Sequence, residues 1–177
     1  GSSLSGSSVG EKVIIPYLRH KGIGSLDMVI ATHAHNDHIG GLKDVIGGIK
    51  TERMAVSPLM LENEVMADLT TVCKLHGTEV IALSKGDRIW INENIRLDIL
   101  YPSVVNNYSL NNQSLVIKLS YMEAEFLFTG DIEEEAEKLC NDRFDLKGKN
   151  QYGDIYTQGI IAGASFILRQ NRWRKFS

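Results

Sequence analysis

The sequence is poor in cysteine and has no long apolar run. Two cysteines, Cys73 and Cys140, are too few for a disulfide scaffold and lack a metal-binding spacing, so we expect two reduced, packed thiols. No segment approaches the roughly 18 apolar residues of a membrane span, and none resembles a signal peptide, so no membrane insertion by this chain is expected. The net charge of −3 argues against general attraction to nucleic acid, although a local metal site can still hold a phosphate.

The composition is that of an ordinary globular protein. Of the 177 residues, 43% are hydrophobic and 23% are charged, which is enough to bury a substantial core. We expect residues 1–177 to form a single domain. The first ten residues, GSSLSGSSVG, are rich in glycine and serine and are expected to be flexible.

Helical and strand patterns alternate along the chain. Leu61, Val65 and Leu69 recur at helical spacing, and Gly77 follows as a C-cap. The compact apolar run at 25–32 is typical of a buried strand. Such a mixture predicts an α/β layered domain. Helices are expected at 11–22, 41–49, 61–77 and 132–141, and strands at 25–32, 52–57 and 78–84, in a hairpin over 87–100 and in an antiparallel pair over 114–131.

Histidine is scarce, yet three of the five histidines lie within six positions. The stretch ATHAHNDHIGGL places His33, His35 and His38 around Asp37, directly after the predicted strand. Loops at the C-terminal ends of strands commonly carry the chemistry of α/β folds. The other two histidines precede glycines near predicted helix ends, where a cation suits the helix dipole.

The spacing within this cluster favours a metal site on a tight loop. Its side chains cannot all point the same way from a strand or a helix, but a loop can bring them together. Imidazole nitrogens and carboxylates are ligands for zinc, manganese or iron, and two such ions can share one site. Gly40 and Gly41 let the backbone turn closely behind it. The alternative, a polar surface loop with unrelated histidines, does not account for the gathering of three.

The pattern H-x-H-x-D-H after an apolar strand resembles the signature of the metallo-β-lactamase fold. The segments VIIPYLRHKGIGSLDMVIATHAHNDHIGGL, NNQSLVIKL and FLFTGDIEEEAE are also similar to the C-terminal hydrolase domain of ComEC-type competence proteins, which are membrane proteins of bacterial DNA uptake. The likeness covers roughly residues 10–140 and implies a metallo-β-lactamase-like αββα layered sandwich. Many ComEC-type domains carry an acidic residue where this chain has His35, which keeps open a stand-alone hydrolase of the same superfamily.

The resemblance also implies roles for individual residues. His33 and His35 are expected to bind one divalent metal ion, and Asp37 with His38 a second; the ions are zinc or manganese. Asp131, in the segment FTGDI, is expected to bridge them. Asp37 would also orient the attacking water and is the candidate catalytic residue. The alternative role for Asp131 is that of N-cap of the following helix.

A second family motif, NNQS, contains Asn111, Asn112 and Ser114. Two interpretations stay open for it. Asn112 and Ser114 line the site and bind the substrate, or the segment caps a turn before the next strand.

A site of this kind points to hydrolysis. Two cations lower the pKa of a shared water to near neutrality and neutralise charge that develops on a phosphoryl or carbonyl oxygen. The resemblance implies a phosphodiesterase that acts on single-stranded DNA during uptake, as a soluble domain of a membrane-embedded parent protein at the outer face of the bacterial plasma membrane. The alternatives are a stand-alone hydrolase of a lactam, lactone or thioester, and a metal-depleted, non-catalytic domain.

Two features of the family are missing from this sequence. Domains of this fold begin with strands that end in an aspartate–glycine turn, and the ComEC type has a late His-His-Gly-Ser motif, but this chain has no histidine after His76. We therefore expect a fold that is incomplete at both ends and metal ions that are weakly bound or absent, because fewer ligands hold each ion. The tail from about Asn141 onward resembles nothing in the family; a divergent C terminus or a shifted reading frame explains it, and the gene sequence distinguishes the two.

Overall fold

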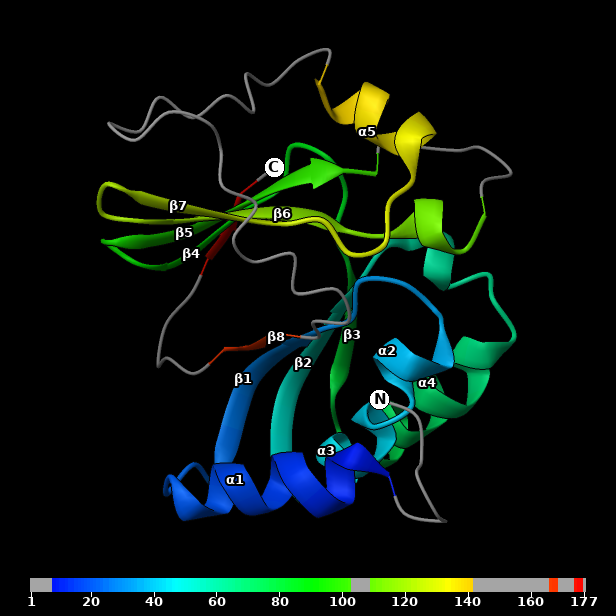
Figure 1. Ribbon diagram of the computed structural model, residues 1–177. Coiled ribbons are helices and arrows are strands. Elements are labelled where there is room, and N and C mark those ends of the chain that lie inside the picture. Colours follow the sequence, from blue (N-terminus) through cyan, green and yellow to red (C-terminus); the bar gives the residue numbers. More distant parts are fainter. Residues whose placement is uncertain (1–7, 103–108, 142–165, 169–173, 177) are drawn as a thin grey trace.

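Two β-sheets pack face to face, with helices on both outer sides (Figure 1). The computed structural model describes residues 8–102, 109–141, 166–168 and 174–176. Most of the predicted tail after residue 141 and the first seven residues lie outside this part of the chain, so their predicted character stays a prediction. Gly10 is described: it is buried and begins a helix.

The first sheet has the strand order β3-β2-β1-β8. Its three longer strands are parallel, and β8 pairs antiparallel with β1 at the edge. Parallel strands need crossover connections, which the helices between them supply. The strands are β1 (Ser25–Ile30), β2 (Lys50–Val56), β3 (Glu79–Ala82) and β8 (Phe166–Leu168).

The second sheet is antiparallel throughout, with the order β7-β6-β5-β4-β9. Tight turns join β4 to β5 and β6 to β7, as the two predicted antiparallel pairs require. The strands are β4 (Arg88–Asn92), β5 (Ile95–Tyr101), β6 (Val116–Tyr121), β7 (Ala124–Phe128) and β9 (Arg174–Phe176).

The helices cover the outer faces of the sandwich (Figure 1). Gly77 ends α4 in the left-handed conformation, with φ of +70°, as predicted for a glycine C-cap. Within the described residues, none of the helices combines the length and the apolar character that crossing a bilayer requires. The helices are η1 (Gly10–Ile14), α1 (Ile15–His20), α2 (Asn36–Ile39), α3 (Leu42–Gly48), η2 (Pro58–Met60), α4 (Val65–His76), η3 (Asn111–Gln113) and α5 (Glu134–Asn141).

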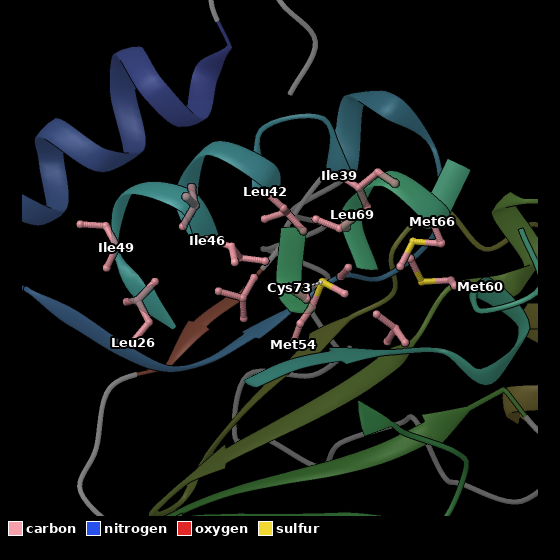
Figure 2. Close-up of a cluster of buried hydrophobic side chains, with 14 of the residues drawn as sticks. Leu26, Ile39, Leu42, Ile46, Ile49, Met54, Met60, Met66, Leu69 and Cys73 are labelled. Atoms are coloured by element: carbon pink, nitrogen blue, oxygen red, sulfur yellow. Dashed lines mark hydrogen bonds between the residues drawn. The ribbon is translucent and has the colours of Figure 1, made fainter. Parts of the chain in front are cut away.

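Three layers of buried side chains hold the sandwich together. Figure 2 shows the first layer, where residues such as Ile46 and Leu69 of the helices pack on Leu26 and Met54 of the first sheet. A second cluster fills the space between the sheets, and a third lies between the second sheet and α5. Both cysteines are buried and unpaired, which confirms the prediction of packed thiols. The helix–sheet–sheet–helix order confirms the predicted α/β layered architecture.

Candidate metal centre

The loop that follows β1 holds the histidine cluster against the end of the sandwich. His33 is fully buried and His38 nearly so, whereas His35 is half-buried and Asp37 is exposed. The loop ends in the one-turn helix α2, because the backbone N–H groups of His38 and Ile39 both donate to the carbonyl of His35, at 2.9 and 3.0 Å. This helical turn, which the sequence pattern did not predict, sets the directions of Asp37 and His38.

Asp131 reaches the cluster from the second sheet. It follows β7 and comes directly after Gly130, which has a φ of +58°. An Oδ of Asp131 lies 3.1 Å from Nε2 of His38 and 3.7 Å from Nε2 of His33. The backbone N–H of Leu115, just before β6, donates to the carbonyl of Thr32, just after β1, at 2.9 Å. The site therefore lies where the two sheets meet.

The structure brings all five predicted ligands together in two overlapping groups. Nε2 of His33 lies 3.1 Å from Nδ1 of His35, and His33, His35 and Asp131 each offer a ligand atom within 4.8 Å of the others. Asp37 belongs to the second group, since its carboxylate lies 3.6 Å from Nε2 of His38. Asp131 contacts both groups, since its carboxylate lies close to the imidazoles of His33 and His38.

Burial controls the protonation of the central imidazole. It lowers the pKa of His33 to about 4, with a further lowering from neighbouring His38, whose ring centroid is 3.9 Å away. His33 is therefore neutral at pH 7, and a neutral imidazole has the lone pair that binds a metal ion. The hydroxyl of Thr32 lies 3.3 Å from Nδ1 of His33, which leaves Nε2 directed at the cluster.

This set of nitrogen and oxygen donors fits a divalent cation. Three imidazoles with two carboxylates are ligands that zinc accepts, and manganese also takes such mixed sets. The donors come from a short loop and from the segment after β7, both tied to the sheets. The structure thus contains a possible His-His-Asp metal site, with Asp37 and His38 beside it.

The NNQS segment lies under the loop that carries Asp131. Asn112 and Ser114 are buried, and both side chains bond to the backbone between β7 and α5: Asn112 accepts from Glu133 N–H at 2.7 Å and Ser114 from Asp131 N–H at 3.2 Å. Asn111–Gln113 form η3, the turn before β6. These contacts tie the NNQS segment to the chain between β7 and α5. The role of Asn112 and Ser114 in substrate binding stays a prediction.

Glu133 was not recognised from the sequence. It is exposed, and hydrogen bonds from Asn111, Ser109 and Asn112 lower the pKa of its carboxyl group. The run of acidic residues around it predicts only a favourable helix N terminus. The strands β6 and β7 separate Glu133 from the NNQS motif, and no short sequence pattern connects the two.

Comparison with known proteins shows which family this chain resembles. The sequence profile of the Metallo-beta-lactamase superfamily matches residues 3–64, which include the histidine cluster. The chain is 31% identical over 131 residues to ComE operon protein 3 of Bacillus subtilis, covering 74% of this chain and 17% of that protein. It is 28% identical over 139 residues to Recombination protein 2 of Haemophilus influenzae, covering 78% of this chain and 16% of that protein.

These matches confirm the resemblance inferred from the motifs, to the metallo-β-lactamase superfamily and to competence proteins of the ComEC type. The chain spans about a sixth of the length of the curated relatives it matches.

Proposed function

We propose that this chain, as a metallo-β-lactamase-type domain, is a metal-dependent hydrolase that cleaves phosphodiester bonds of single-stranded DNA. The observation that carries the proposal is the meeting of His33, His35 and His38 with Asp131, which comes from a different sheet. Imidazoles and carboxylates that lie close together lose contact with water, and the carboxylates repel one another. Both effects are unfavourable, and a bound cation offsets them.

Each of the five residues has a proposed task. His33 and His35 would hold one divalent zinc or manganese ion, Asp37 and His38 would hold a second, and Asp131 would contribute to both. When bound, such ions activate a water at neutral pH and neutralise charge on a phosphoryl oxygen. The buried His33 stays neutral and keeps its Nε2 available, because burial lowers its pKa to about 4.

Asp37 is the residue proposed for catalysis. Its side chain is 66% exposed, whereas that of Asp131 is 29% exposed, so Asp37 is accessible from solvent at the open side of the cluster. There it would accept a hydrogen bond from the attacking water and orient that water toward the phosphorus atom.

The choice of DNA follows from the relatives, which are competence proteins. In a protein of that kind, this domain would degrade the strand that is not taken up, at the outer face of the bacterial plasma membrane. The membrane-embedded part would then belong to a longer parent protein.

A cleavage assay with added metal tests the proposal. The purified chain is incubated with an end-labelled single-stranded oligonucleotide and Mn²⁺ or Zn²⁺, and in parallel with chromogenic lactam, lactone and thioester substrates. We expect the chain to cleave the DNA but none of the small substrates, and we expect a chelator to abolish the cleavage. Hydrolysis of a small substrate in its place would support a stand-alone hydrolase. No hydrolysis of any substrate and no bound metal would support a metal-depleted, non-catalytic domain.

A pair of aspartate variants locates the activity. Asp37→Ala is expected to abolish metal-dependent cleavage. Asp68→Ala is expected to retain it, because Asp68 is an exposed aspartate of α4 that pairs with Lys43 at 3.6 Å. An active Asp37→Ala protein would refute the role proposed for this carboxylate.

A further inference from the structure

We infer, on the basis of the proposed function, that Asn112, Ser114 and Glu133 form a clamp that positions Asp131 at the metal centre. The hydrogen bonds between Asn112 and Glu133, and between Ser114 and Asp131, hold the segment after β7. The three residues act on the backbone of the segment that carries Asp131, and so they are positioning residues.

The first part of the clamp holds Asp131 itself. Its backbone N–H donates to the hydroxyl of Ser114 at 3.2 Å, and Ser114 has no exposed surface. Ser114 also packs directly under Gly130, so closely that a Cβ on Gly130 would lie 2.7 Å from the Ser114 hydroxyl oxygen. The buried side chain of Ser114 therefore holds the backbone of Asp131 in position.

The second part is a reciprocal pair two residues further along. The backbone N–H of Glu133 donates to Oδ1 of Asn112 at 2.7 Å, and Nδ2 of Asn112 donates to the Glu133 carboxylate at 3.0 Å. Asn112 is only 2% exposed. One amide side chain thus binds both the backbone and the carboxylate of the same residue, which fixes the direction in which the chain leaves Asp131.

Neighbouring groups hold each member of this pair. Ser109 and Asn111 donate side-chain hydrogen bonds to the Glu133 carboxylate, at 2.9 and 3.1 Å. The hydroxyl of Tyr101, a buried residue of β5, donates to the carbonyl of Asn112 at 2.9 Å. The clamp is thereby anchored in the second sheet, and it links that sheet to the carboxylate that meets the histidines of the first.

Such support matters because a metal ligand must be held to within a fraction of an ångström. Mutation of the groups that hold metal ligands in place typically changes metal affinity about 10- to 100-fold. Asp131 is the only one of the five predicted ligands that does not come from the loop after β1. Its place relative to the imidazoles therefore depends on the contacts of its own segment.

A double-mutant cycle tests the clamp on the full chain, with Co²⁺ as the probe. Affinity and the visible Co²⁺ spectrum are measured for Glu133→Gln, Asn112→Asp and the double variant. Glu133→Gln leaves a single amide oxygen for the three donors Ser109, Asn111 and Asn112, which share two carboxylate oxygens in Glu133. Asn112→Asp places a carboxylate opposite the Glu133 carboxylate. The double variant restores a donor–acceptor pair with reversed polarity and the original net charge. We expect each single variant to bind Co²⁺ about tenfold more weakly and the double variant to recover most of the affinity.

The sign of the Asn112→Asp effect separates the clamp from a general effect of charge. A carboxylate added near a cation site strengthens binding if charge alone matters, whereas the clamp requires weaker binding. Tighter or unchanged binding by Asn112→Asp would overturn the inference. The matched controls Asn94→Asp, in the β4–β5 turn, and Glu125→Gln, on β7, are expected to leave the affinity unchanged.

Amide hydrogen exchange by NMR provides a readout that needs no metal. Without metal, the backbone N–H groups of Asp131 and Glu133 should exchange slowly in the chain without substitutions. Their exchange should be faster in each single variant and slow again in the double variant. Unchanged exchange in the single variants would refute the clamp. If the chain without substitutions bound no Co²⁺, the proposed function would fail. The exchange data would still decide whether the clamp holds the segment that carries Asp131. Ser114→Ala, which removes only the hydroxyl that accepts from Asp131, serves in the same two assays if Asn112→Asp does not fold.

Discussion

Replacement of Gly130 by alanine should both destabilise the protein and weaken metal binding at the proposed site. Gly130 has a φ of +58°, and a Cβ added there would lie 2.7 Å from the hydroxyl oxygen of Ser114, 2.8 Å from its Cβ and 3.3 Å from Cβ of Thr32. Both neighbours are buried. Accommodation of the methyl group therefore requires a shift of the segment that carries Asp131.

The size of the effect follows from two contributions. A left-handed backbone costs a residue with a Cβ about 1–2 kcal/mol more than glycine. Contacts below 3.0 Å with a buried side chain add an overpacking cost of about 1–3 kcal/mol. We therefore expect Gly130→Ala to lower the free energy of unfolding by about 2–5 kcal/mol, a large part of the 5–15 kcal/mol that typically stabilises a domain.

Gly77→Ala is the matched control. Gly77 also has a positive φ, +70°, but nothing lies within 4 Å of an added Cβ, so only the backbone cost of about 1–2 kcal/mol applies. Urea denaturation followed by circular dichroism, with chelator present, measures both variants, and a Co²⁺ titration measures the metal site. Equal destabilisation by the two variants, with unchanged Co²⁺ affinity, would refute the argument that Gly130 is required for space beside Ser114.

Three further predictions concern the metal, the reaction and the thiols. Dialysis against a mild chelator should remove most bound metal, because the late histidine of the ComEC type is missing from this sequence; two retained equivalents per chain would reveal ligands beyond the five named. For the same reason the 177-residue chain should cleave single-stranded DNA only slowly, and rapid cleavage would mean that the late histidine is not needed. Burial raises the pKa of Cys73 and of Cys140 to about 11, so at pH 8 both thiols are protonated and the native protein should react slowly with a disulfide reagent and quickly once unfolded in urea; fast labelling of the native protein would contradict their burial.

The sequence by itself determined the local elements and the centre of the site. Hydrophobic periodicity predicted α4 with its cap at Gly77, the buried strand β1 and the hairpin of β4 and β5, because each depends on side chains that are close in sequence. The cluster from His33 to His38 was equally visible, since four candidate ligands lie within one loop. The resemblance to a family then pointed to Asp131.

Only the tertiary structure decided how these parts meet. The edge strands β8 and β9 have three residues each, too few for a periodic pattern, and they exist through pairing with β1 and β4. The approach of Asp131 to His38 depends on the packing of one sheet on the other.

The same holds for the contacts of Asn112 with Glu133. Each residue taken alone is an ordinary polar side chain of a turn or a helix end, and local propensity is all that a short stretch of sequence expresses. Their hydrogen bonds form because β6 and β7 bring the two ends of the hairpin side by side. A contact between distant segments is set by the packing of the whole domain, and so the support of Asp131, the proposed metal ligand, became visible only in the fold.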